Sequence, residues 1–184
     1  MVSASSEEGQ SEVLLRRATP ADIDAIASIE RVSFPTPWSR ALLAHEIRER
    51  ENLYLVAEID GEIVGFIGLW QVLDEGHICT LAVDPKHRRQ GLGELLVLAA
   101  LRDAAAAGSD TVHLEYRVGN ERAASLYQKL GFEQAGLRRG YYTDTGEDAV
   151  IARIDELGTR AGRARLDAAW ERWHRERSLQ VAVE

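Results

Sequence analysis

Apolar and polar positions along the chain follow two periods, which together predict a mixed α/β (α+β) domain. Runs rich in Val, Ile, Leu and aromatic residues between turn residues predict strands, and apolar residues spaced three or four apart predict helices. The predicted strands are residues 13–18, 53–59, 63–72, 76–83, 111–116, 132–142 and 148–154. The predicted helices begin near Thr19, Ser39, Gly93 and Asn120. The pattern therefore predicts about seven strands and about four helices in this part of the chain.

The two ends of the chain differ from this central domain, which spans residues 13–154. Residues 1–12 are polar and acidic, which predicts a disordered tail. Residues 155–184 are rich in arginine and predict a helical extension, because Leu166, Ala169, Trp170 and Trp173 recur at helical spacing. Such an apolar stripe packs either on its own domain or on a partner protein.

A basic loop rich in glycine joins the strand of residues 76–83 to the next helix. The segment Leu81–Leu96 reads LAVDPKHRRQGLGELL, so a strand is followed by four basic residues, two glycines and a helix. The first turn of a helix has unpaired N–H groups and a partial positive charge, and glycines let an anion approach the backbone. The loop therefore suits a diphosphate, the alternative being a simple turn between a strand and a helix.

Composition narrows the class of protein. The 184 residues carry a net charge of −8, which argues against general nucleic-acid binding. One cysteine, Cys79, rules out an internal disulfide framework and suits a reducing compartment. The first residues lack a signal-peptide pattern, and no apolar run is long enough to cross a bilayer. We expect a cytoplasmic protein that binds neither membranes nor nucleic acid directly, whose oligomeric state is left open.

The order of elements and several motifs resemble the GNAT superfamily of N-acetyltransferases over about residues 14–154. The motif of that superfamily is Gln or Arg, two residues, Gly, one residue, and Gly or Ala, and Arg88, Gly91 and Gly93 match it. Four further segments resemble the bacterial ribosomal-protein-alanine N-acetyltransferases. They are FPTPWS (34–39), QVLDE (71–75), HLEYRVGNERAASLYQKLGF (113–132) and RRGYYTDTGEDAVI (138–151). The acidic tail and the helical extension go past the usual ends of that family.

The resemblance implies the GNAT fold, which has a central mixed sheet of about seven strands flanked by about four helices. It also implies acetyl-CoA as the acetyl donor. Its diphosphate would bind the basic loop, and the backbone of Leu81–Val83 would pair with its pantetheine arm like an added strand. Backbone N–H groups near Val83 would polarise the thioester carbonyl. The implied contacts are Leu81, Ala82, Val83, Arg88, Arg89, Gln90, Gly91, Leu92, Gly93 and Asn120. From the residues alone, Asn120 is equally well explained as a helix cap.

The same resemblance implies two catalytic residues. Glu115, on a strand face with His113 and Arg117, would be the general base, and Tyr127 would be the general acid for the leaving thiolate. Without the resemblance, Glu115 could be an exposed strand acid in an ion pair, and Tyr127 an aromatic residue in an apolar helix stripe. A weak base suits an α-amine, whose pKa is near about 8, better than a lysine amine near about 10.4.

The acceptor implied by the resemblance is a protein N-terminus, in particular the N-terminal alanine of a small-subunit ribosomal protein. The alternatives are a small amine or a lysine side chain, or a non-catalytic module that binds acyl-CoA or a partner. Trp38, Glu75, Tyr141 and Tyr142 are candidate acceptor contacts, although Glu75 and the tyrosines could equally lie on an exposed loop.

Two other kinds of chemistry are not expected. The histidines show no metal-ligand spacing, so we expect no metal. A covalent acetyl-enzyme on Cys79 is disfavoured because this residue lies in an apolar strand with no evident base beside it.

Overall fold

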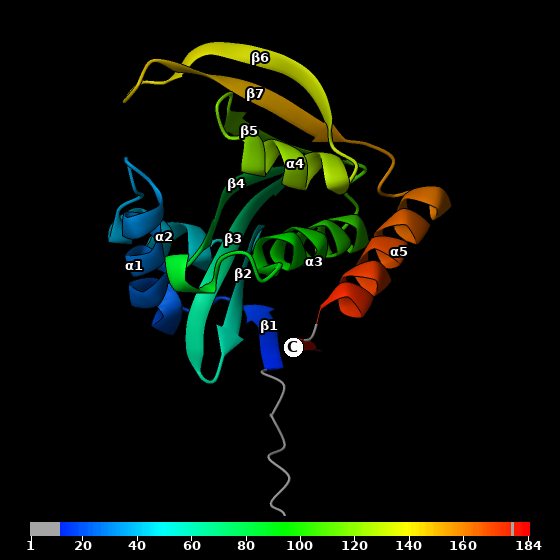
Figure 1. Cartoon of the computed structure of the whole chain (residues 1–184), viewed down its shortest axis with the longest axis horizontal. Coiled ribbons are helices and arrows are strands. Elements are labelled where there is room, and N and C mark those ends of the chain that lie inside the picture. The colour runs from blue at the N-terminus through cyan, green and yellow to red at the C-terminus, as the bar shows by residue number, and fades with distance from the viewer. Residues whose placement is uncertain (1–11, 178) are drawn as a thin grey trace, which may run out of the picture.

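The computed structural model describes residues 12–177 and 179–184, and its centre is a single mixed sheet (Figure 1). The described strands are β1 (Glu12–Arg17), β2 (Asn52–Ile59), β3 (Glu62–Val72), β4 (Glu75–Val83), β5 (Thr111–Arg117), β6 (Glu133–Tyr142), β7 (Glu147–Ile154) and β8 (Gln180–Val183). The described helices are α1 (Ile23–Ser33), α2 (Arg40–Arg48), α3 (Leu92–Ala106), α4 (Glu121–Lys129) and α5 (Arg160–Glu176). The strand order is β6-β7-β5-β4-β3-β2-β1-β8, so the mixed α/β class is confirmed.

The sheet has eight strands within the described residues, rather than the seven expected. The additional strand is β8, which pairs in parallel with β1 so that Val181 lies opposite Val13. Four residues are too few for an alternating pattern to be distinguished from a loop. The segment after Ile154 is therefore a helix followed by a strand. The predicted tail lies outside the described residues except for Glu12, which is the first residue of β1.

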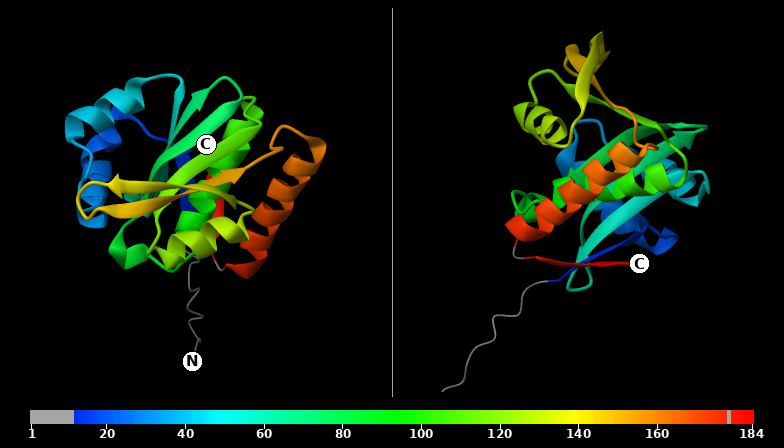
Figure 2. Two further views of the ribbon diagram at one scale, coloured as in Figure 1. Left: turned by 90° about the horizontal axis from the view of Figure 1, so that it is seen from above. Right: turned by 90° about the vertical axis from the view of Figure 1, so that its right-hand side faces the viewer.

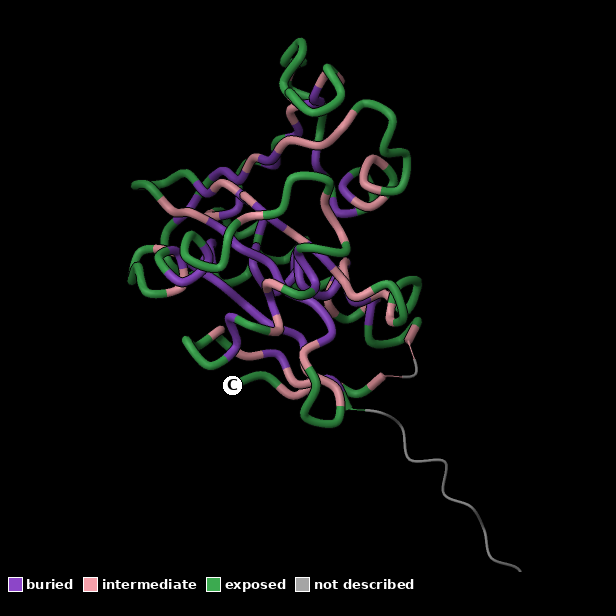
Figure 3. The backbone as a smooth tube through the Cα atoms, turned by 90° about the vertical axis from the view of Figure 1, so that its left-hand side faces the viewer, coloured by how far each residue is buried: buried purple, intermediate pink, exposed green. Residues whose placement is uncertain are grey.

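Helices cover both faces of the sheet. Figure 2 shows α1 and α2 on one side and α3 and α5 on the other. Side chains alternate along β2 accordingly: Leu53 and Leu55 belong to the core under α3, whereas Val56 belongs to the smaller core under α1 and α2. Buried backbone is concentrated in the strands and α3, between exposed outer turns (Figure 3).

Helix α3 is mostly apolar and is buried along most of its length, and its exposed residues Arg102, Asp103 and Ala106 lie near its C-terminal end. The four consecutive residues Leu95–Leu98 have no exposed surface. The sheet covers one side of α3 and α5 packs against it from outside, with Trp173 only 1% exposed. The apolar stripe of α5 therefore packs on its own domain, which is one of the two alternatives left by the sequence. Neither α3 nor any other described helix is long and apolar enough to cross a membrane.

A buried carboxylate connects β1 to the start of α1. Asp22 accepts hydrogen bonds from Arg16 Nη1 at 2.8 Å, from Thr19 N at 2.7 Å and from Thr19 Oγ1 at 2.9 Å. Arg16 is also paired with Glu58 on β2. The hydrogen bond from Arg16 is the largest cause that lowers the pKa of Asp22, from 3.8 to about 2, while burial opposes it.

We expect Asp22→Asn to lower the free energy of unfolding by about 2 kcal/mol at neutral pH. The folded-state pKa of Asp22 is lowered, so its contribution is present above the unfolded pKa and is lost as pH falls toward about 2. In urea unfolding, the difference in free energy of unfolding between Asp22→Asn and the natural protein should be about half as large near pH 3 as at neutral pH. Asp24→Asn, which removes an exposed partner of Arg40, is the control and should change stability little. Equal effects of the two substitutions would contradict the assignment.

Candidate active site

The parallel strands β4 and β5 separate part-way along their length and open a cleft. Their pairing runs from Glu75 and Thr111 to Ile78 and Leu114 and does not continue beyond this point within the described residues. The cleft has a volume of about 690 Å³. Its walls are the loop after α1, the second half of β4, the end of β5, α4 and the turn between β6 and β7. It therefore lies at the carboxyl ends of the two central parallel strands, where α/β folds often bind ligands.

The last residues of β4 present their backbone to this opening. Leu81 and Ala82 pair with Ile67 and Phe66 of β3 on one side, and Val83 pairs with Gly65. On the other side β5 has diverged, and Leu81 lines the cleft. A strand with one free edge can add an extended ligand by backbone hydrogen bonds.

The basic loop leads directly into the first turn of α3. Gly91 precedes α3 with φ of +87°, a left-handed conformation that favours glycine. Leu92 is buried and anchors the helix, whereas Arg89 and Gln90 are exposed. The first-turn N–H groups beside Gly93 have no intrahelical partners, and a phosphate suits them.

Two hydrogen bonds hold the side chain of Arg88 in a fixed position in the basic loop. Its Nε donates to the Val83 carbonyl at 2.9 Å, and its Nη2 donates to Ser33 Oγ at 3.1 Å. The guanidinium therefore connects the end of β4 to the end of α1. Arg89 is exposed and contributes positive charge at the loop.

Glu115 lies in the cleft with its side chain only 5% exposed. His77 Nε2 donates to Oε2 at 2.7 Å, and Arg138 Nη1 is ion-paired with Oε1 at 3.0 Å. The hydrogen bond from His77 is the largest cause that holds the pKa of Glu115 below its ordinary value; burial opposes it, and the charges of His77 and Arg138 reinforce it. Glu115 is therefore a carboxylate at neutral pH.

A row of rings supports His77. The imidazoles of His77 and His113 are stacked with centroids 4.4 Å apart, and Trp70 meets His77 edge-on at 5.6 Å. Trp38 stacks on Trp70 at 6.1 Å. Burial and the neighbouring His77 lower the pKa of His113, so its ring is neutral at pH 7. These contacts fix the imidazole that holds Glu115.

Tyr127 and Asn120 both come from the α4 region and line the same cleft. Tyr127 is 8% exposed and packs against the rings of Tyr116 and Phe132. Burial raises the pKa of Tyr127 well above its ordinary value, so its hydroxyl keeps its proton at neutral pH. Asn120 Oδ1 accepts from Ala123 N at 3.1 Å, so the helix-cap role of Asn120 is present.

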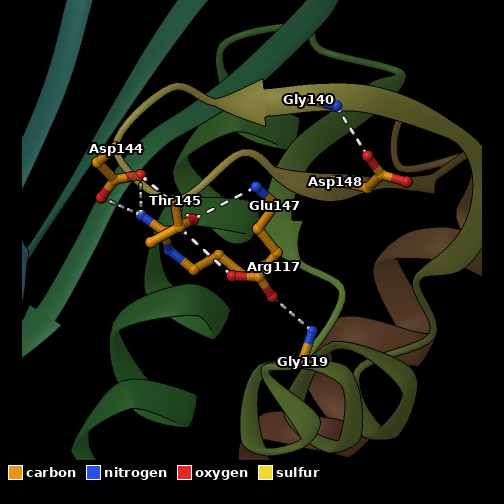
Figure 4. A network of polar contacts seen from close by, with 7 residues as sticks. All are labelled: Arg117, Gly119, Gly140, Asp144, Thr145, Glu147 and Asp148. Carbon is orange, nitrogen blue, oxygen red and sulfur yellow. Dashed lines mark hydrogen bonds and ion pairs between the residues drawn. The ribbon is translucent and has the colours of Figure 1, made fainter.

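The β6–β7 turn is held over the cleft by Arg117 (Figure 4). Its guanidinium donates to both carboxylate oxygens of Asp144, at 3.0 and 2.7 Å, and lies 3.9 Å from the ring centre of Tyr142. Glu147 accepts from Arg117 and from Gly119 N, which joins the turn to the end of β5. The turn is thereby placed so that Tyr141 and Tyr142 line the cleft.

Of the four candidate acceptor contacts, the structure brings three together in the cleft: Trp38, Tyr141 and Tyr142. Glu75 is the exception. It is exposed at the first residue of β4, at the hairpin with β3, and does not line the cleft. Its strand face is shared with His77, but the cleft begins only where β4 and β5 separate.

Several residues in the cleft or in contact with Glu115 were not identified as functional from the sequence. His77 and Arg138 are the partners of Glu115, and Arg117 holds the β6–β7 turn. Glu30 is a buried acid that accepts from Trp38 N and Thr80 Oγ1, and burial raises its pKa. Plain alternation along β4 would place His77 and Leu81 on one face, but the strand bulges at Cys79, so that Ile78 packs in the core under α3 and Ala82 packs in the core under α1 and α2. Neither this bulge nor the pairing of β4 with β5 could be predicted from the sequence pattern.

Cys79 also lines the cleft, but its chemistry does not suit a nucleophile. Its Sγ lies 3.6 Å from the Tyr54 hydroxyl, and burial raises its thiol pKa to about 12. A thiol with that pKa is almost entirely protonated at neutral pH, so it is a poor nucleophile.

The two strands separate between a glycine loop at the end of one strand and a buried carboxylate on the other, an arrangement that suits an enzyme that transfers acyl groups. The family model described as "Acetyltransferase (GNAT) family" matches residues 23–132. The chain belongs to this family and is an N-acetyltransferase, which confirms the resemblance found in the sequence.

Individual relatives are consistent with that membership. A Bacillus subtilis (strain 168) protein with the provisional name [ribosomal protein bS18]-alanine N-acetyltransferase is 41% identical over 131 residues, covering 71% of this chain and 87% of that protein. A Sulfurisphaera tokodaii protein named N-alpha-acetyltransferase is 34% identical over 161 residues, covering 80% and 95%. The crystal structure of the ribosomal-protein-S18-alanine N-acetyltransferase from Escherichia coli matches with a TM-score of 0.74 at 33% identity, covering 78% and 94%.

We expect Asp144→Asn to raise the KM for the amine acceptor a few-fold while leaving the KM for the acyl donor unchanged. The substitution removes the charge that holds Arg117 under the turn, and the turn carries Tyr141 and Tyr142. Steady-state kinetics with each substrate varied in turn would measure both constants. Asp148→Asn is the matched control, because Asp148 accepts from Gly140 N on the same hairpin without contacting Arg117 (Figure 4). An equal rise in both KM values would contradict a role confined to the acceptor.

Proposed function

We propose that the chain transfers the acetyl group of acetyl-CoA to the α-amine of a protein N-terminus, in particular the N-terminal alanine of a small-subunit ribosomal protein. The observation that carries the proposal is Glu115, a charged and buried carboxylate in the cleft of a GNAT enzyme. The names of the Bacillus subtilis and Escherichia coli relatives support the acceptor. A ribosomal acceptor implies a cytoplasmic enzyme.

The donor would enter along the open edge of β4. The first turn of α3 and exposed Arg89 suit its diphosphate, and the backbone of Leu81–Val83 suits its extended pantetheine arm. Backbone N–H groups near Val83 would stabilise charge on the thioester oxygen. Bound acetyl-CoA supplies the activated acyl group, and all other chemistry belongs to residues of the chain.

Glu115 would act as the general base, directly or through one water molecule. Its lowered pKa makes it a weak base. An α-amine has a pKa near about 8, so about a tenth is already neutral at pH 7, whereas a lysine amine is neutral in fewer than about one molecule in a thousand. A weak base is therefore adequate for an N-terminal amine and poorly suited to lysine.

Tyr127 would act as the general acid. Burial keeps its hydroxyl protonated, so a proton is available when the CoA thiolate leaves. A thiol with a pKa near about 8.5 is already a good leaving group, and the gain from this proton is accordingly limited.

Acetylation of short peptides, located by mass spectrometry, tests the acceptor. We expect acetyl-CoA to modify a peptide that begins with alanine at its α-amine, and a peptide with the same sequence but a blocked N-terminus to remain unmodified. Modification that survives the block and disappears when lysine is removed would identify a lysine acetyltransferase. Binding of CoA without turnover on any peptide or small amine would identify a non-catalytic module.

Substitution of the two proposed catalytic residues tests the mechanism. Glu115→Gln should reduce kcat by about a hundredfold or more, because loss of a general base commonly costs that much. Tyr127→Phe should reduce kcat by a smaller factor. The control is Glu62→Gln, an exposed carboxylate on the β2–β3 hairpin. If Glu115→Gln keeps wild-type kcat, Glu115 is not the base.

A further inference from the structure

The C-terminal helix contacts the loop that precedes α3, although the two are more than 80 residues apart in the sequence. Trp173 Nε1 donates a hydrogen bond to the Gly91 carbonyl at 3.0 Å. A Cβ on Gly91 would lie 2.5 Å from Arg177 Nε and 3.0 Å from Trp173 Nε1. The end of α5 is therefore packed directly on the loop, and it lies outside the segment matched by the family model.

The hydrogen bond from Trp173 fixes the orientation of the peptide group between Gly91 and Leu92. In a planar trans peptide, the Gly91 carbonyl and the Leu92 N–H point in opposite directions. The Gly91 carbonyl accepts both from Trp173 and from Leu95 N, the first backbone bond of α3. Holding this carbonyl therefore orients the Leu92 N–H, which has no intrahelical partner in the first turn.

Two basic residues, one of them just after α5, balance the charge of Glu94. Glu94 lies in the first turn of α3 and is 6% exposed, so its carboxylate sits beside the loop. Lys129 of α4 pairs with it at 2.8 Å, and Arg177, just after α5, has Nη2 at 3.8 Å. An unbalanced acid there would repel an anion at the helix start.

We propose that α5 preorganises the diphosphate-binding loop of this enzyme. Trp173 is a positioning residue that acts through the Gly91–Leu92 peptide, and Arg177 is a positioning residue that offsets the charge of Glu94. The inference rests on the proposed function only in that CoA is taken to bind this loop. It assigns a role to the C-terminal extension in donor affinity, independent of the acceptor.

The first test is Trp173→Phe, which keeps an aromatic ring in the core and removes the N–H donor. Calorimetric titration with CoA should show a Kd raised about fivefold, the size expected for one hydrogen bond. The KM for acetyl-CoA should rise with it, while kcat and the acceptor KM stay unchanged. Trp170→Phe is the matched control, because Trp170 lies on the same helix and contacts Arg102 and His174. Its CoA affinity should equal that of the natural protein.

The second test changes the charged pair of Arg177 and Glu94 and leaves the aromatic residues of the core unchanged. Arg177→Gln should weaken CoA binding, and Glu94→Gln added to it should restore the affinity. A Trp173→Phe protein that unfolds normally on heating yet binds CoA within twofold of wild type would overturn the inference, as would failure of Glu94→Gln to restore binding. Since CoA titration needs no acceptor, absence of peptide acetylation would reject the proposed function and leave this inference standing.

Discussion

The separation of β4 from β5 is the feature on which the site depends. Up to Ile78 and Leu114 the two strands pair in parallel, and beyond this point each has an open edge. One edge exposes the backbone of Leu81–Val83, and the other carries Glu115. A parallel connection requires a crossover, and here α3 begins at the end of β4. The strand edge, the helix start and the carboxylate therefore border one opening for topological reasons.

Electrostatics then set the chemistry within that opening. Glu115 is buried, which alone would raise its pKa, but His77 and Arg138 outweigh burial and keep it charged. Tyr127 is buried without such partners, and its pKa moves up. The two candidate proton-transfer groups are thus held in opposite protonation states by their surroundings, as expected for a base and an acid that work together.

The segment after Ile154 completes the fold in two places, over the outer side of α3 and at the β1 edge of the sheet. Helix α3 is apolar on more than the side that faces the sheet, so its outer side also needs a cover. Helix α5 provides it through Leu166, Ala169 and Trp173, and β8 then pairs with the edge of β1, as the right-hand view of Figure 2 shows. The same packing brings Trp173 to Gly91, so a contact that stabilises the core also fixes the loop.

The sequence by itself predicted the described strands other than β8, the helices and the basic loop, since alternation, caps and glycines act over a few residues. With the family resemblance it also predicted Glu115, Tyr127 and the residues around Gly91 as site candidates. Only the tertiary structure brought His77 and Arg138 to Glu115, left Glu75 outside the cleft, added β8 and connected α5 to Gly91. These contacts join residues tens of positions apart, and strand register and side-chain packing, which no local pattern encodes, decide which of them form.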